Sequence, residues 1–311
     1  MLTLILWPFE RKIATLGHEF LPGPILMGKP KAIPELEGAI EALPAFPKSV
    51  QKVLEMTSNL NCMPRDLIDV LETDPVLTGR ILKLVNSAYF ALARRVDSLR
   101  HALVYLGLNT IKHMAMGLAA VGAMPKETSG GISMLSFQKD ALAGGEVVRI
   151  AGAHLLARQS EQDQLYLMGL FHNLGDVLCA VYAPEQWEVY SALPPSSIEE
   201  MDGKATELFG LPPREIAARV LEKWEMEPDI SQGLRELPNA GQEGASRFSQ
   251  SLWIALSFLE KERPSTHSTG VILGPGSKEM DRILALLLEY PADVLTSIDR
   301  SERFLIESTP N

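Results

Sequence analysis

The chain has 311 residues, of which 46% are hydrophobic and only 6% are aromatic, a composition that excludes a disordered chain and favours helices over sheets. Its formal net charge is −10 and no Lys/Arg-rich cluster is present, which argues against nucleic acid as a partner, because duplex binders present a basic face to phosphates. Two scattered cysteines without CxxC spacing, and an apolar start too short to cross a bilayer, predict a cytoplasmic protein with no membrane contact.

The chain is predicted to have three parts. Residues 1–40 contain several prolines and glycines, so we expect a loosely structured arm, with a short strand at most within residues 1–10. Residues 41–260 have the texture of amphipathic helices and form the predicted helical domain. Residues 261–311 are predicted to be a linker and a C-terminal helical extension, ending in an amphipathic helix at 278–290.

The first well-marked helix begins at Asp74-Pro75. Asp74 can cap the helix by accepting an amide hydrogen bond, and Pro75 suits the first helical position, where no amide is needed. The apolar residues that follow repeat at i, i+4, i+7, i+8 and i+11, which predicts one buried stripe made of Leu77, Ile81, Leu84, Val85 and Ala88.

A pair of helices follows. Asp97 or Ser98 is expected to cap the first, Gly107 to end it with a left-handed turn, and Asn109 to cap the second. The second helix is rich in Met, Ala, Gly and Leu, so we expect it to pack in the core and not to read DNA as a helix-turn-helix does.

The second half of the chain contains the strongest candidate for a functional site, the doublet His172-Asn173 in "MGLFHNLGDVL" (168–178). We expect this doublet on an apolar helix, preceded by a polar turn at 161–164 and followed by a surface loop at 191–205. It differs by one letter from the His-Asp doublet that holds metals in phosphohydrolases. Asparagine offers a neutral carbonyl where aspartate supplies the charge that offsets desolvation of a cation. No HExxH or HxH pair gives another local metal pattern.

An ordered succession of motifs resembles the HDOD domain, the HD-related output domain of bacterial signalling proteins. It covers roughly residues 41–238 and rests on Asp74-Pro75, Asn86-Ser87, Ser98-Leu99, Ala102 and Leu106-Gly107. The resemblance implies an all-α fold, an HD-domain-like multi-helix bundle, with 41–260 as the HDOD-like domain. It also implies a regulatory or binding role, without established catalysis for the family as a class.

The resemblance also locates the positions where an HD-type protein has metal ligands. This chain has Lys139 where a His opens the helix before the doublet, Pro213 where a His often follows Gly, and Glu236, Leu237 and Pro238 near a frequent His pair. We therefore expect no catalytic residues, no metal and no cofactor, and a vestigial pocket containing Lys139, His172 and Asn173. A purely structural interpretation is that His172 and Asn173 bridge neighbouring helices by hydrogen bonds.

Three functions remain open. We favour a non-enzymatic signal-transduction module that binds a protein partner of a bacterial signalling pathway or a small ligand. The alternative is a metal-dependent HD-type phosphohydrolase acting on a nucleotide or cyclic dinucleotide, which rests on His172. The third is a sensor of a small anion, in which Lys139 supplies positive charge to the abandoned pocket.

Overall fold

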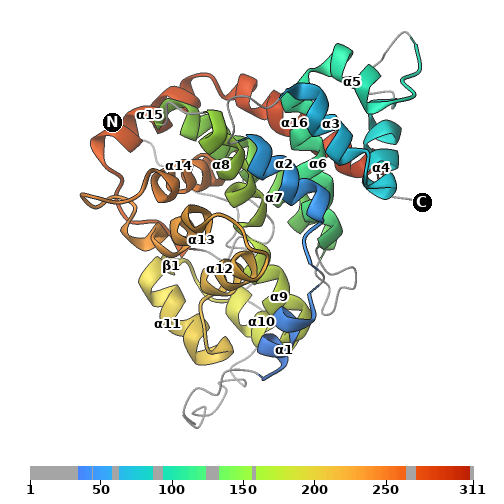
Figure 1. The fold of residues 1–311 in the computed structure, drawn as a ribbon. Coiled ribbons are helices and arrows are strands. Elements are labelled where there is room, and N and C mark those ends of the chain that lie inside the picture. Colours follow the sequence, from blue (N-terminus) through green and yellow to red (C-terminus); the bar gives the residue numbers. More distant parts are fainter. Residues whose placement is uncertain are drawn as a thin grey trace, which may run out of the picture.

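A computed structural model describes residues 34–43, 45–57, 63–86, 94–123, 133–155, 159–263 and 271–308. These residues are almost entirely helical, which confirms the all-α prediction (Figure 1). The predicted strand within residues 1–10 lies outside the described residues. Two two-residue strands, β1 (Ser196–Ser197) and β2 (Val271–Ile272), pair in parallel where none was expected.

The helices fall in two runs along the chain. The first run is α1 (Pro34–Ala42), α2 (Lys48–Thr57), α3 (Pro64–Leu71), α4 (Pro75–Val85), α5 (Leu99–Leu106) and α6 (Leu108–Ala123). The second run is α7 (Met134–Leu155), α8 (Gln159–Phe171), α9 (Leu174–Tyr182), α10 (Pro184–Ser191), α11 (Ile198–Phe209), α12 (Pro213–Lys223), α13 (Pro228–Arg235), the 3-10 turn η1 (Leu237–Asn239), α14 (Arg247–Glu262), α15 (Lys278–Glu289) and α16 (Pro291–Ser308).

Local capping signals set several helix ends as predicted. The amide of Leu77 donates to Asp74 Oδ1 at 2.9 Å and Pro75 opens α4. Ser98, and not Asp97, caps α5, and Gly107 ends it with φ of 76°. The prediction for Asn109 was wrong, because α6 already begins at Leu108 directly after that glycine turn.

The stripe on α4 is buried where its side chains are described. Leu77 is 5% exposed, and Ile81 and Val85 are fully buried. The side chains of Leu84 and Ala88 lie outside the described residues.

Three predictions for the second half were wrong. Residues 161–164 belong to α8 and form no turn, because Asp163 is buried there and pairs with Lys112 Nζ of α6 at 2.5 Å. Much of the expected loop at 191–205 is α11, whose first turn is capped by Ser197 Oγ. The helix at 278–290 is not the last one, since α16 follows it.

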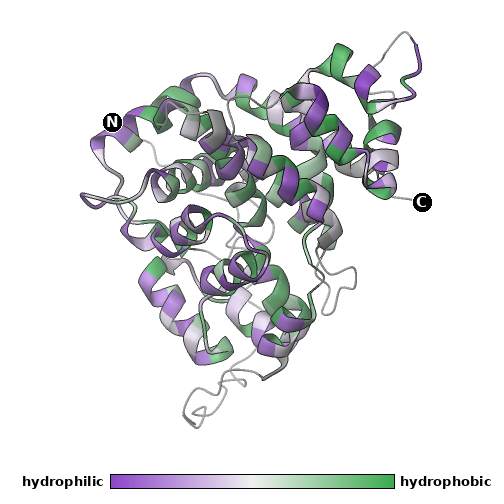
Figure 2. Ribbon diagram, viewed as in Figure 1, coloured by the Kyte–Doolittle hydropathy of each residue, from purple (hydrophilic) through white to green (hydrophobic). Residues whose placement is uncertain are grey.

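Helix α7 is the centre of the fold. Twelve of its 22 residues are buried, and it packs against α8, α14 and α16 (Figure 1). Most of the surrounding helices are green on one side and purple on the other in Figure 2, as expected for amphipathic helices around a shared core. The C-terminal helices therefore complete the core of the domain, and α16 contacts both α7 and α4.

One stretch, residues 161–182, is long and apolar enough to cross a membrane by composition alone. However, 78% of its most apolar 18-residue window is buried inside the protein, and the helical run is interrupted at His172-Asn173, between α8 and α9. The stretch is therefore a core segment of the bundle.

Candidate functional site

A cavity of about 230 Å³ lies beside the His172-Asn173 doublet. Its wall comes from α7, the turn between α8 and α9, the helices α9, α10, α11, α12 and α14, the turn η1 and the segment around β2. The lining residues are Phe137, Asp140, Ala143, His172, Asn173, Asp176, Tyr190, Ile198, Asp202, Pro213, Arg214, Leu237, Leu256, Leu259, Glu260, Arg263, Val271 and Leu273. The cavity thus combines a largely apolar wall with several ionisable groups.

The sequence suggested that the doublet lies within one helix. The structure places it at a break between two helices instead. Helix α8 ends at Phe171, and Asn173 precedes the first residue of α9. The His172 ring fits under α7 only because residue 144 is glycine: a Cβ there would lie 2.6 Å from the ring Cε1. Close backbone packing therefore holds the imidazole in place.

The hydrogen bonding of His172 determines what it offers to the cavity. Nδ1 lies 2.7 Å from the carbonyl oxygen of Gly169, and because a carbonyl can only accept, Nδ1 carries the proton. Burial lowers the pKa of His172, against the opposing effects of the Gly169 carbonyl and Asp140. At neutral pH the ring is neutral, and Nε2 is an acceptor.

Asn173 ties the start of α9 to α7. Its Nδ2 donates to the carbonyl oxygen of Phe137 at 3.1 Å, and the residue is only 6% exposed. The Oδ1 atom is buried and accepts no hydrogen bond from any described residue. The bridging role expected of the doublet therefore holds for Asn173, whereas His172 bonds back to Gly169 of α8.

On α7, the predicted site residue was Lys139, and the structure places its neighbour in the cavity instead. Lys139 is absent from the lining, which includes Phe137, Asp140 and Ala143. These three residues follow one another at a spacing of three, so they share a face of the helix. The same spacing, counted from Phe137, could have identified Asp140 in the sequence.

The cavity also contains a carboxyl group that the sequence analysis missed. Asp176 lies in the first turn of α9, three residues after Asn173, which brings both to the same side. Burial raises the pKa of Asp176 to about 7. The group therefore exchanges a proton near neutrality.

Both arginines of the cavity already have carboxylate partners. Arg214 Nη1 pairs with Asp202 Oδ1, and Arg263 Nη2 lies 2.5 Å from Oε1 of the buried Glu302 on α16. Neither arginine was predicted, because α12 and α14 meet the doublet only in the folded chain.

Pro213 and Leu237 line the cavity at two positions where the resemblance places histidines. Pro213 opens α12 and is packed tightly against α9: a Cβ added to Gly175 would lie 1.8 Å from the Pro213 carbonyl oxygen. Neither side chain has an atom that can bind a metal ion.

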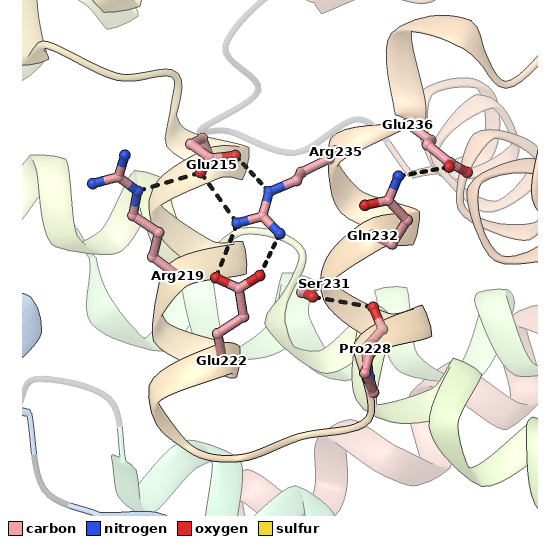
Figure 3. Close-up of polar contacts among 8 residues, drawn as sticks. All are labelled: Glu215, Arg219, Glu222, Pro228, Ser231, Gln232, Arg235 and Glu236. Atoms are coloured by element: carbon pink, nitrogen blue, oxygen red, sulfur yellow. Dashed lines mark hydrogen bonds and ion pairs between the residues drawn. The ribbon is translucent and has the colours of Figure 1, made fainter.

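Helices α12 and α13, next to these positions, are joined by an ion-pair network (Figure 3). Arg235 Nε of α13 lies 2.7 Å from Glu215 Oε2 of α12, and the same guanidinium pairs with Glu222, about two turns further along the same face of α12. These two carboxylates raise the pKa of Arg235 well above its ordinary value. Burial works to raise the pKa of Glu215, but Arg235 and Arg219 outweigh it and lower that pKa. Ion pairs thus cross-link this part of the wall.

A divalent metal ion does not fit this donor set. Within the described part of the chain, no three His, Cys, Asp or Glu side chains are close enough together to hold one. At position 173 the side chain is an amide, whose nitrogen donates to the Phe137 carbonyl oxygen, and not a carboxylate that could bind a metal ion. Two further ligand positions are apolar.

Residues 43–238 match the model of the HDOD domain. The chain belongs to the HDOD family. The HDOD chain is similar to a solved protein of Marinobacter aquaeolei whose name proposes signal transduction (TM-score 0.66, 23% identity, 88% of this chain and 60% of that one). It also resembles an HDOD domain protein of unknown function from Geobacter sulfurreducens (0.64, 18%, 87% and 98%). A protein of Shewanella amazonensis, whose name proposes a phosphohydrolase, is a further neighbour (0.56, 20%, 86% and 98%).

Among curated proteins, an uncharacterized protein of Treponema pallidum is 23% identical to the HDOD chain over 239 residues, which are 72% of this chain. The aligned part is 44% of that relative, so this chain spans less than half of its length. The match to the family model establishes the family, and the solved structures establish the fold.

Proposed function

We propose that this HDOD protein is a non-enzymatic module of a bacterial signalling pathway, which acts by binding a protein partner or a small ligand. The observation that carries the proposal is that the second residue of the doublet is an asparagine with a structural hydrogen bond. Asn173 uses its amide to join α9 to α7, and the cavity beside it lacks a donor set for a divalent ion among the described residues.

The cavity volume also bears on the choice. About 230 Å³ lies below the roughly 300–1,000 Å³ typical of pockets for drug-sized ligands. This favours a small molecule over a cyclic dinucleotide. We expect the protein to work in the cytoplasm, where such a ligand or a signalling partner would be met.

The second candidate is an HD-type phosphohydrolase acting on a nucleotide or cyclic dinucleotide. His172 is favourably placed for it, since it lines the same cavity as Asp140 and Asp176 and its Nε2 is an acceptor. The proposed activity in the name of the Shewanella amazonensis neighbour points the same way.

A hydrolysis assay separates the two functions. The full chain is incubated with Mn²⁺ and either bis(p-nitrophenyl) phosphate or a cyclic dinucleotide, beside His172→Ala as the matched variant. We expect equal rates for the two proteins. A wild-type rate that is lost in His172→Ala, with an unchanged melting temperature, would establish the phosphohydrolase.

A further inference from the structure

The cavity has a polar character that the sequence did not suggest. Four of its lining residues are acidic, namely Asp140, Asp176, Asp202 and Glu260, and two are basic. Both basic residues are engaged, Arg214 with Asp202 and Arg263 with Glu302. With Lys139 outside the lining, no unpaired lysine or arginine of the described cavity wall is left to receive an anion.

Apart from Tyr190, whose hydroxyl can also donate, the polar groups that remain are hydrogen-bond acceptors. Asp176 receives no hydrogen bond or ion pair from the described residues, and it lines the cavity. Oδ1 of Asn173, a residue more than nine-tenths buried, is also without a donor, and Nε2 of His172 is an acceptor because Nδ1 carries the proton. A buried acceptor without a donor is costly, so these groups favour a ligand that donates.

The partial positive charge at the N-terminus of α9 does not reverse the preference for a hydrogen-bond-donating ligand. The N-terminal end of α9 faces the cavity, and a helix N-terminus carries roughly half a positive charge. That half charge is smaller than the negative charge that Asp176 and Glu260, on α9 and α14, can contribute to the cavity. An anion would be repelled by these carboxylates, whereas a cation would be attracted by them.

The rest of the wall is largely apolar. It consists of Phe137, Ile198, Leu237, Leu256, Leu259, Val271 and Leu273, with Ala143, Pro213 and the ring of Tyr190, which also carries a hydroxyl. Such a wall suits the hydrocarbon part of a ligand, and the acceptors near the doublet suit a charged donor group.

We propose that the cavity binds a small organic amine, with its ammonium group among Asp176, His172 and Asn173 and its hydrocarbon part against the apolar wall. This replaces the small anion considered from the sequence. The inference rests on the proposed binding function and specifies its ligand class.

The test compares three probes of equal chain length: n-hexylamine, hexan-1-ol and hexanoate. Each is titrated into the full chain at millimolar concentration, and binding is followed by calorimetry and by thermal shift. We expect hexylamine to bind at least tenfold more tightly than hexan-1-ol, and hexanoate to bind most weakly. Equal or tighter binding of hexanoate would overturn the proposal.

Two isosteric variants locate the binding. Asp176→Asn keeps the shape of the side chain and removes its charge, so hexylamine should bind at least tenfold more weakly to it. Glu207→Gln removes an exposed carboxylate of α11 that is not part of the cavity and should leave binding unchanged. Equal losses in the two variants would show nonspecific attraction of amines to an acidic protein and would overturn the proposal.

The outcomes also distinguish this inference from the proposed function. Suppose that hexanoate binds as tightly as hexylamine or more tightly, or that both variants lose binding equally, and that no metal-dependent hydrolysis is detected. The proposed ligand class is then wrong, and the non-enzymatic function stands. If hydrolysis depends on His172, the proposed function itself fails. Should Asp176→Asn not fold, the order of the three probes on the wild-type chain still decides the ligand class.

Discussion

Replacing Asn173 by aspartate restores the lettering of the His-Asp doublet, and we predict that it destabilises the protein without creating a metal site. The amide that donates to the Phe137 carbonyl would become a carboxylate oxygen facing a carbonyl oxygen at about the same place. Leaving such a buried acceptor without a donor costs about 1–3 kcal/mol.

The charge adds to this cost. Asp176, in the same cavity, shows what the environment does to a carboxyl group: burial raises its pKa from 3.8 to about 7. A similar rise at position 173 would be about 3 pKa units, or about 4 kcal/mol once the group is fully ionised. Lys139 does not line the cavity, and its two described arginines, Arg214 and Arg263, already pair with Asp202 and Glu302, so neither is free to reduce the penalty.

The sign of the pH dependence follows from the raised pKa. Below the unfolded-state value of about 4, the new carboxyl is protonated in both states, carries no charge penalty and can itself donate to Phe137. The destabilisation grows as pH rises from about 4 and levels off above the folded-state pKa. We expect a loss of about 4 kcal/mol at pH 7, where protonation of the folded-state carboxyl limits the total cost, and less than about 1 kcal/mol at pH 4, relative to wild type at the same pH.

Urea denaturation of both proteins between pH 4 and pH 8 measures this difference. Asn239→Asp is the matched control, because Asn239 is exposed, and it should change stability by less than about 0.5 kcal/mol without a pH trend. A variant at position 173 as stable as wild type at pH 7, or one that loses stability towards acid, would refute the reasoning.

Three further changes test the packing of the core and of the wall next to the site, each by urea denaturation. Ile81→Ala on α4 should cost roughly 2–5 kcal/mol because Ile81 is fully buried, while Val76→Ala, 67% exposed on the same helix, should be nearly neutral; similar costs would contradict the buried stripe. Gly175→Ala should prevent normal folding, since its Cβ would meet the α12 backbone at 1.8 Å, whereas Gly203→Ala on open α11 should stabilise by about 0.5–1 kcal/mol; a stable, native Gly175→Ala protein would disprove that contact. Asp163→Asn should cost roughly 3–5 kcal/mol by leaving its buried lysine partner unpaired, and a neutral result would show that this pair is solvated.

The parts of the fold that could be predicted depend on local signals. Asp74 and Ser98 cap helices with their own side chains, and Gly107 adopts a positive φ that few other residues tolerate, so each can be recognised from its neighbours in sequence. The helical class followed from such signals and from apolar periodicity.

The errors occurred where tertiary contacts decide. The polar run at 161–164 looks like a turn, but its Asp163 is matched by Lys112, 51 residues away in sequence, and is therefore tolerated in a buried helix. The apolar pattern continues through His172-Asn173, so the break between α8 and α9 gave no signal.

The candidate site was predicted only in part for the same reason. His172 and Asn173 line the cavity as expected. On α7, the comparison with the HDOD pattern selected Lys139, whereas the next residue, Asp140, lines the cavity. Arg214 and Arg263 could not be associated with the doublet, because their helices meet it only after folding. Without them, the charge of the cavity, and therefore the kind of ligand it suits, could not be inferred.

The central claim is that the site beside the doublet holds no metal ion and supports binding instead of hydrolysis. It is tested most directly by measuring the metal content of the full chain, purified without chelators and then dialysed against Mn²⁺ or Zn²⁺, by mass spectrometry of the elements. The account predicts well under one ion per chain, with the same value for wild type and His172→Ala. One tightly bound ion per wild-type chain that is lost in His172→Ala would contradict it.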